Sequence, residues 1–508
     1  MNVLLQSNQR YLELLGANIP NPSKKHRLIT YLQYYDVDHG KAIYNYLTRS
    51  FIWIPYEQFD RIFNDDYQNE EYVDYMWRNF FIVNEDFNEQ EKQQLLKDKD
   101  RPNQYDDYYL KSGEILEYTI FTTMACNARC AYCYEKGRPQ VPMTSKTANE
   151  VADYIIRSAQ KTGKKIALRW FGGEPLVGEH VIDIICQKVK DAGYDYYSSF
   201  TTNGFLLKEE KIKKYKDLWH FSNCQITIDG TEENYNKIKN YKNVKGKNPF
   251  QIVMNNVQFL ADNNIGVSIR MNMDLNNAED IKKLIKYIYD RFGNNNYVSP
   301  YAYVIFDSED DNNMRSEEEC KMLYDKLDEI NDLLTEYGYT RNKKNPSQYV
   351  RSAHCMIDHG RAVVIGTNGD LGLCEHYSEE HFWGHINKPE MKNMDEINIF
   401  KEYEKDLDIC KNCPILPDCI RPKLCHALRR CNEPIKNWHI REAQMGMENL
   451  YHNIMNSNNN RYKFSNNCNN CNNICNDYSQ NNFVNENNKC NIPKLSFFDK
   501  LKIKLKMK

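Results

Sequence analysis

Three cysteines in one short segment have the residue type and spacing to hold an iron–sulfur cluster. The segment over 124–134 reads MACNARCAYCY and carries Cys126, Cys130 and Cys133 as C-x3-C-x2-C. Clusters are held by cysteine thiolates, and a four-iron cluster with only three of them leaves one iron open to an external ligand. If that ligand is a sulfonium compound, an electron from the cluster can break its C–S bond and generate a carbon radical. A structural zinc loop and a chance grouping are the alternatives.

A second group of cysteines follows further along the chain. Seven cysteines between 355 and 431 are too many for a single four-ligand site. A zinc ribbon is the alternative, with Cys410 and Cys413 in one knuckle, but the second C-x2-C pair of a ribbon is missing. We call this group the second cysteine field. It comprises Cys355, Cys374, Cys410, Cys413, Cys419, Cys425 and Cys431.

The elements that must position the first three cysteines are strands alternating with helices. From Leu116 onwards, short β-rich segments alternate with amphipathic ones, which predicts a parallel sheet, open or curled into a partial barrel. In such folds the chemistry gathers at the carboxyl ends of the strands, which is where the three-cysteine segment begins. The predicted strands are Glu117–Phe121, Lys165–Trp170, Ser198–Thr202, Gln225–Ile228, Val267–Asn272 and Tyr301–Phe306. The predicted helices are Ala148–Gln160, Ile182–Lys190, Ile212–Leu218 and Asp280–Arg291.

Polar and glycine residues follow the later strands in turn. In WFGGEP (170–175) two glycines permit close approach of the backbone to a ligand, and Glu174 offers an anion for an ammonium group. FTTNG (200–204) offers hydroxyl and amide groups suited to a ribose, and Arg270 could pair with a carboxylate through two hydrogen bonds. Taken singly, each is typical of a strand-end turn or of a polar residue at the edge of a core. Together they predict a cofactor site that includes Gly172, Gly173, Glu174, Thr202, Asn203 and Arg270.

These motifs resemble those of the radical S-adenosylmethionine (SAM) superfamily over about 115–310. The matching residues are Cys126, Cys130, Tyr132 and Cys133, then Gly172–Pro175, Thr202–Gly204 and Thr227–Gly230. The resemblance implies a partial (β/α)6 TIM-like barrel, a [4Fe–4S] cluster with one open iron site, and S-adenosylmethionine bound at that iron. Reductive cleavage of this cofactor would give a 5′-deoxyadenosyl radical, which abstracts a hydrogen atom from the substrate.

The resemblance also implies individual cofactor contacts. Tyr132 belongs to the cofactor site, between the last two cysteines. In relatives a serine of the fourth-strand motif and an arginine twelve residues later touch the cofactor, and the corresponding residues here are Thr227 and Lys239. Because lysine carries a compact charge rather than a planar fork of donors, Arg270 is an alternative partner for the cofactor carboxylate.

The second cysteine field resembles the SPASM domain, a C-terminal extension of radical enzymes that modify peptides and proteins. The resemblance implies two auxiliary [4Fe–4S] clusters, although Cys419 and Cys425 are separated by five residues instead of three. One cluster would be held by Cys355, Cys374 and Cys425, with a fourth ligand from His354, His359, a distant cysteine or the substrate. The other would be held by Cys410, Cys413, Cys419 and Cys431.

Glu375 directly follows one of these proposed ligands. In the related sulfatase-maturating enzymes an acidic residue at this place removes a proton from the substrate. The resemblance therefore makes Glu375 the candidate general base. A solvated carboxylate beside His376 is the alternative.

The first 115 residues carry no cysteine and are predicted to form a small α+β module. KAIYNYLTRSFIWIP (41–55) predicts two strands around a turn at Thr48–Ser50, and Val73, Met76, Trp77 and Phe80 have the spacing of a helix face. There are two equal alternatives for this module. One is a simple cap on the next domain. The other is a winged-helix-like module that would bind a leader peptide by strand addition to its hairpin edge. The predicted organisation is 1–115 N-terminal module, 116–310 radical SAM core, 311–350 helical bridge, 351–456 SPASM domain and 457–508 Asn-rich and basic tail.

Composition restricts the classes of partner and compartment. The 508 residues carry a net charge of −3, without the basic excess of nucleic-acid-binding proteins. No segment has the form of a signal peptide or approaches the ~20 apolar residues of a membrane span. The seventeen cysteines are therefore expected in a reducing cytoplasm.

The predicted function is oxidative maturation of a peptide or protein substrate. The leading hypothesis is thioether or other cross-link formation in a ribosomally made, cysteine-rich peptide. The alternatives are formylglycine formation in a sulfatase and a non-catalytic iron–sulfur electron carrier. A low-potential reductant such as ferredoxin or flavodoxin is the other expected partner.

Overall fold

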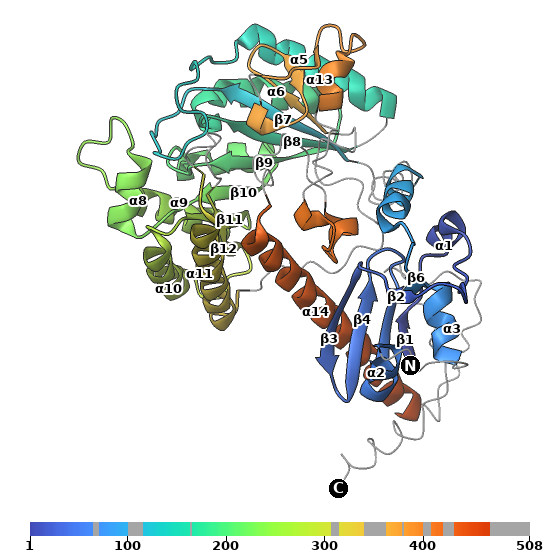
Figure 1. Cartoon of the computed structure of the whole chain (residues 1–508). Coiled ribbons are helices and arrows are strands. Elements are labelled where there is room, and N and C mark those ends of the chain that lie inside the picture. Colours follow the sequence, from blue (N-terminus) through green and yellow to red (C-terminus); the bar gives the residue numbers. More distant parts are fainter. Residues whose placement is uncertain are drawn as a thin grey trace. The chain divides into compact units, whose positions relative to one another are not determined.

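A nine-stranded sheet is the largest element of the structure (Figure 1). The computed structural model describes residues 1–63, 71–99, 115–162, 165–305, 314–339, 362–377, 380–399, 408–419 and 431–467. Met1–His452 form one compact unit, and the second unit, Asn453–Lys508, is described only as far as the end of one helix. The sheet belongs to the first unit.

Six parallel strands of this sheet follow one another in the chain, in the order β12-β11-β10-β9-β8-β7. The six predicted strands are therefore confirmed, with shifted ends. Among the described strands β12 and β7 are not neighbours, so the barrel is not closed. The strands are β7 (Ile115–Thr123), β8 (Lys165–Gly172), β9 (Tyr196–Thr202), β10 (Phe221–Thr227), β11 (Gly266–Met273) and β12 (Val298–Val304).

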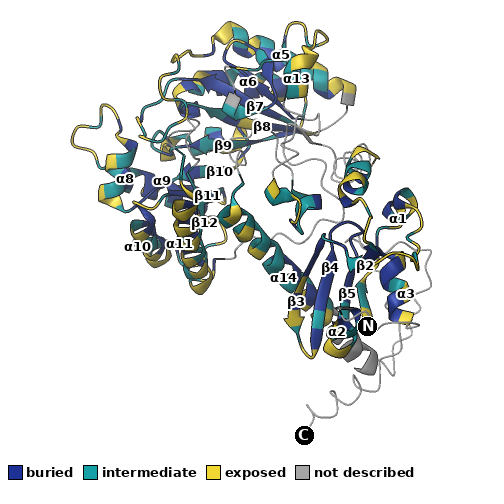
Figure 2. Ribbon diagram, in the orientation of Figure 1, coloured by how far each residue is buried: buried dark blue, intermediate teal, exposed yellow. Residues whose placement is uncertain are grey.

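Amphipathic helices connect the strands, and each buries one face. In α10 the fully buried residues are Ile281, Leu284, Ile285 and Ile288, at the spacing i, i+3, i+4, i+7. They belong to one core with the strand residues, which Figure 2 shows in dark blue along β7 to β10. The four predicted helices correspond to α5, α6, α7 and α10. The helices are α5 (Ser145–Thr162), α6 (Glu179–Asp191), α7 (Ile212–Asp217), α8 (Glu232–Lys239), α9 (Pro249–Asp262), α10 (Ala278–Phe292) and α11 (Glu317–Glu336), with 3-10 turns η1 (Pro175–Gly178) and η2 (Glu209–Lys211).

A short hairpin extends the sheet beyond β7. β13 (Ala362–Ile365) pairs in parallel with β7, and β14 (Asp370–Gly372) returns antiparallel to β13 and then pairs with β15 (Gly384–His385). Because Cys374 is two residues after the end of β14, the hairpin attaches this cysteine to the edge of the main sheet. The predicted ligands Cys355 and Cys425, with His354 and His359, lie outside the described residues. The remaining elements are η4 (Glu375–Tyr377), α13 (Met394–Ile399), η5 (Asp408–Cys410), η6 (Leu416–Asp418) and α14 (Glu433–Asn467).

The N-terminal module contains a second, antiparallel sheet in the order β1-β5-β4-β3. The predicted hairpin is β4–β5, and the predicted helix is α3, which buries Val73, Met76 and Trp77. Both hairpin strands already have a second neighbour, so the prediction of strand addition to the hairpin edge is wrong, and the outer strands are β1 and β3. The elements are β1 (Asn2–Leu5), α1 (Gln9–Leu15), β2 (His26–Leu28), β3 (Leu32–Val37), β4 (Gly40–Asn45), β5 (Phe51–Pro55), α2 (Tyr56–Phe63), α3 (Glu71–Arg78) and β6 (Ile82–Asn84).

None of the described helices combines the length and the apolar character that a membrane span needs.

Candidate active site

The cysteine loop, residues 124–134, begins at the carboxyl end of β7 and is shaped by local hydrogen bonds. Ala125 N donates to Thr123 Oγ1 (3.0 Å), and Ala128 N donates to Cys126 Sγ (3.4 Å). All three loop cysteines are free thiols. Burial raises the pKa of the Cys126 thiol to about 12. The thiolate that a metal requires therefore forms only when the metal replaces this proton.

Two glycines at the end of β8 let the cysteine loop pack directly against the sheet. A Cβ atom on Gly173 would lie 2.5 Å from Met124 O and 2.7 Å from Ala125 O. Gly173 N donates to Thr123 O (3.0 Å), which fixes this contact. Gly172 has φ +123° and is equally crowded. The glycines do permit the predicted close approach, and in this structure the approaching group is the loop backbone.

Glu174 connects the ends of β8 and β9. Its carboxylate is fully buried and accepts hydrogen bonds from Leu176 N (3.1 Å), Thr202 Oγ1 (2.7 Å) and Asn203 N (2.8 Å). Burial raises the pKa of Glu174, and these donors oppose that rise. The described contacts of Glu174 and Thr202 are thus with other residues of the chain. The contact of Glu174 with a cofactor ammonium, and that of Thr202 with a ribose, stay predictions.

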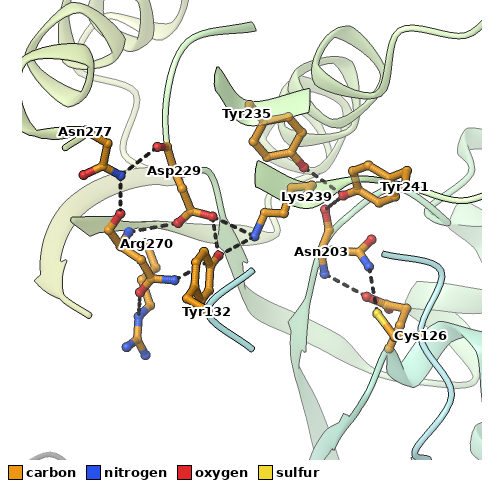
Figure 3. Close-up of polar contacts among 11 residues, drawn as sticks. Cys126, Tyr132, Asn203, Asp229, Tyr235, Lys239, Tyr241, Arg270 and Asn277 are labelled. Atoms are coloured by element: carbon orange, nitrogen blue, oxygen red, sulfur yellow. Dashed lines mark hydrogen bonds and ion pairs between the residues drawn. The ribbon is translucent and has the colours of Figure 1, made fainter. Parts of the chain in front are cut away.

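Asn203 links β9 to the cysteine loop (Figure 3). Its side-chain nitrogen donates to Asn127 Oδ1 at 2.6 Å, and its side-chain oxygen accepts from Phe205 N at 3.1 Å. The same nitrogen lies 4.0 Å from Cys126 Sγ. The amide that was predicted to face a ribose therefore holds the beginning of the cysteine loop.

Tyr132, Asp229 and Lys239 form a buried polar cluster on the other side of the loop (Figure 3). Lys239 Nζ lies 2.9 Å from Asp229 Oδ2 and donates to the Tyr132 hydroxyl at 3.0 Å, and that hydroxyl donates to Asp229. Asn272 N donates to the carboxylate oxygen Oδ1 of Asp229, and Asn277 Nδ2 donates to the backbone oxygen of Asp229. Sequence reasoning did not single out Asp229, although the ITIDG motif contains it.

One predicted cofactor contact, Lys239, belongs to this cluster, and two others, Thr227 and Arg270, lie on β10 and β11. Lys239 is only 3% exposed, and its ammonium is directed at Asp229 and Tyr132. Thr227 and Arg270 are opposite each other in the β10–β11 ladder. Arg270 Nε donates to Asn272 Oδ1 (2.8 Å), and its guanidinium lies 4.0 Å from the ring centroid of Tyr303.

The first part of the second cysteine field lies beside the cysteine loop. The rings of Tyr134 and His376 are 4.8 Å apart, and Arg138 donates to His376 O at 3.4 Å. Tyr134 follows Cys133 directly, and His376 is two residues after Cys374. The fold thus brings together two cysteine-bearing segments whose contacting residues Arg138 and His376 are 238 residues apart in the chain, as expected if they share one site.

The later cysteines of the field are near one another. Burial, together with the nearby Cys419, Cys431 and Cys410, raises the pKa of Cys413 to about 12. The predicted four-cysteine set is therefore brought into one neighbourhood. Within the described ranges, no three Cys, His, Asp or Glu side chains are arranged as a site for a single metal ion.

Residues 120–288 match the model of the Radical SAM superfamily. This is a radical SAM domain. It includes the cysteine loop and all residues of the Tyr132–Asp229–Lys239 cluster, and it makes the chain a radical SAM enzyme. The cofactors of the superfamily are a [4Fe–4S] cluster and S-adenosylmethionine.

Several curated proteins are similar to this chain. The uncharacterized protein MJ0907 of Methanocaldococcus jannaschii is 26% identical over 52% of this chain and 86% of its own length. The GTP 3′,8-cyclase of Clostridium perfringens strain SM101 is 28% identical over 35% of this chain and 54% of its own, and a probable GTP 3′,8-cyclase of Methanococcus maripaludis strain C5 is 32% identical over 25% and 40%. The chain thus spans about half or less of these cyclases.

Two solved structures align with much of this chain. Native anSMEcpe with bound AdoMet aligns with 68% of this chain and 100% of its own, at 15% identity and a TM-score of 0.49. Streptococcus suis SuiB bound to precursor peptide SuiA aligns with 78% and 95%, at 12% identity and a TM-score of 0.44.

The residues of the cysteine loop fit the cluster of the superfamily. The donor set is three free thiols on one loop, which suits a four-iron cluster with one iron left open. Asn127 Nδ2 is a buried donor without a hydrogen-bond partner in the described part of the chain. A ligand at the loop would therefore find both thiolates and an amide donor.

Proposed function

We propose that this radical SAM enzyme oxidatively modifies a peptide, and that the leading product is a thioether or other cross-link in a ribosomally made, cysteine-rich peptide. The observation that supports the proposal is the position of Cys374. The hairpin β13–β14 extends the radical SAM sheet, and His376 contacts Tyr134 of the cysteine loop. Cys374 would therefore lie close to the place where a substrate radical would arise.

When bound, the cluster and S-adenosylmethionine together supply a 5′-deoxyadenosyl radical that takes a hydrogen atom from the substrate. A substrate radical forms a new bond oxidatively only if one more electron and one proton leave. In this proposal the second cysteine field holds two auxiliary [4Fe–4S] clusters for that electron. Cys374, with Cys355 and Cys425, would hold one, and Cys410, Cys413, Cys419 and Cys431 the other.

Glu375 is the proposed acceptor of the proton. It begins η4, directly after Cys374, and it is half-buried. A carboxylate at this place would be close to a substrate held between the two cysteine-bearing segments. The external reductant in this proposal is a ferredoxin or flavodoxin, because a low-potential electron is required to start each turnover.

The N-terminal module would hold the leader segment of the substrate, at the outer strand β1 or β3. Support comes from its contacts with the second cysteine field. Arg49 Nη2 lies 2.6 Å from Asp418 Oδ1, and Lys97 Nζ donates to Cys419 O at 3.2 Å. Peptide binding to the module would thus occur next to cysteines that the reaction uses.

The experiment is anaerobic co-expression of the chain with candidate cysteine-rich peptides, followed by mass spectrometry. We expect a peptide with a two-hydrogen mass loss that does not react with a hydrazide. The control is a chain with Cys126, Cys130 and Cys133 changed to Ala, which should leave the peptide unmodified. A hydrazide-reactive product would carry an aldehyde and favour formylglycine formation instead.

A second assay distinguishes a radical SAM enzyme from a non-catalytic electron carrier. The reconstituted chain, reduced by dithionite in the presence of S-adenosylmethionine, should yield 5′-deoxyadenosine, whereas an electron carrier would yield none. Turnover of GTP would contradict the proposal and favour the activity for which the curated relatives are named.

A further inference from the structure

The end of α8 is attached to the cysteine loop by both backbone and side chain. Arg129 N donates to Lys239 O (2.8 Å), and Lys242 N donates to Asn127 O (2.8 Å). Lys239 also donates from its ammonium to the Tyr132 hydroxyl, at 3.0 Å. These three bonds reach the loop at Asn127, Arg129 and Tyr132, between its first and last cysteines.

The ammonium of Lys239 pairs with the carboxylate of Asp229, which hydrogen bonds hold in position. Asp229 is fully buried at the end of β10, and Lys239 is 3% exposed. Asn272 N donates to Asp229 Oδ1 (3.0 Å), and Asn272 Nδ2 donates to Tyr132 OH (3.3 Å). Two buried charges and a phenol thus satisfy one another, and removal of either charge would leave the other unpaired.

We propose that Lys239 and Asp229 are positioning residues for the cysteine loop. Their ion pair fixes the Tyr132 hydroxyl and thereby the spacing of the two flanking cysteines, Cys130 and Cys133. Lys239 is then not the partner of the cofactor carboxylate, which is the role that its place in the sequence implied. This inference depends on the radical SAM domain and not on the nature of the substrate.

The physical reason is that outer groups determine how well a loop presents its metal ligands. Thiolates bind a cluster tightly only when the loop does not have to rearrange, and hydrogen-bonded neighbours of ligands supply that order. A lysine whose ammonium is already surrounded by Asp229 and Tyr132, and that is almost inaccessible, would have to break both contacts to reach a cofactor. Positioning requires no such rearrangement.

The test compares Lys239→Met, Asp229→Asn, the double variant and Tyr132→Phe with a matched control, Lys188→Met. Lys188 Nζ lies 2.8 Å from Asp153 Oδ2, and both side chains are partly exposed to solvent. The control therefore also removes a lysine–aspartate pair, but not a buried one. Each purified chain is titrated anaerobically with iron and sulfide, cluster loading is followed by absorbance, and the cofactor Kd is measured on the loaded chains by equilibrium dialysis with S-adenosylmethionine. The signal of the reduced cluster is recorded by electron paramagnetic resonance before the cofactor is added.

We expect each single charge variant to weaken cluster binding by about 10- to 100-fold, and the double variant to recover a large part of that loss. Tyr132→Phe, which removes one hydroxyl and keeps the ring, should change the resonance spectrum without cofactor and leave the cofactor Kd unchanged. Two results would overturn the proposal. One is normal cluster loading in all variants, as in Lys188→Met. The other is normal loading with a weakened cofactor Kd in the double variant, which would make Lys239 a cofactor ligand.

Discussion

Gly173 shows how a residue without a side chain determines the position of a metal-binding loop. Its backbone touches the cysteine loop so closely that a Cβ would lie 2.5 Å from Met124 O. We expect Gly173→Ala to displace the loop, to lower the free energy of unfolding by about 1–3 kcal/mol, and to reduce the iron bound per chain. Iron analysis after anaerobic reconstitution and urea unfolding measure the two effects.

The control for this substitution is Gly266→Ala, at the beginning of β11. The nearest atom to a Cβ there is Asn223 Cβ at 3.5 Å, which is an ordinary contact. Iron loading should be unchanged, because β11 keeps its position. Equal loading of the Gly173 and Gly266 variants would show that the crowding at Gly173 is relieved without moving the loop.

At the scale of residues, the sequence identified the cysteines and glycines better than their polar neighbours. The spacing of Cys126, Cys130 and Cys133 is local and therefore visible in one segment. The partner of Lys239 is less visible, since Asp229 lies in the segment between β10 and α8 and only the tertiary structure brings the two side chains together. A buried acid in a strand-end motif, ten residues before a lysine, is the signal that could have revealed the pair.

At the scale of elements, the six parallel strands were predictable and the seventh was not. Alternating strands and helices set a repeating pattern from Leu116 onwards. β13, in contrast, has only four residues, yet its Val363 is opposite Tyr118 in the ladder. Such a pairing across the chain follows from tertiary packing and leaves no local pattern.

The turn between β4 and β5 carries the clearest prediction at this scale. Arg49 is almost fully buried, and its partner Asp418 in η6 is 18% exposed. We expect Arg49→Met to lower the free energy of unfolding by about 3–5 kcal/mol, because the carboxylate is left without its counter-charge. Adding Asp418→Asn should restore part of that loss. Urea unfolding of the single and double variants measures both.

The matched control is the exposed pair of Arg78 and Asp74, whose side chains are 77% and 71% exposed. Arg78→Met should cost less than about 1 kcal/mol, because water already solvates both charges. If Arg49→Met were as mild as Arg78→Met, the contact between the N-terminal module and η6 would contribute little to stability.

At the scale of the whole molecule, the sequence suggested separate domains, and the structure joins several of them within Met1–His452. Gln33 Nε2 in β3 donates to Ile440 O in α14 at 2.6 Å, and Tyr35 OH donates to Met447 O at 3.2 Å. With the ion pair of Arg49 and Asp418, these contacts tie the N-terminal module to segments some 370 to 410 residues later. Composition and spacing reveal boundaries between segments, whereas contacts of this kind depend on complementary surfaces.

These contacts predict that the N-terminal module and the radical SAM sheet unfold together. Trp77 is buried in α3, and Trp219 is fully buried beside the sheet, so each reports on one region. In chains that keep only one of these two tryptophans, the others being replaced by Phe, the fluorescence midpoints in urea should coincide, as cooperative unfolding requires. Arg49→Met should then shift both midpoints by the same amount. Because an independent cap would lose only its own contacts, a shift confined to the Trp77 signal would contradict the coupling and leave the module as a separable domain.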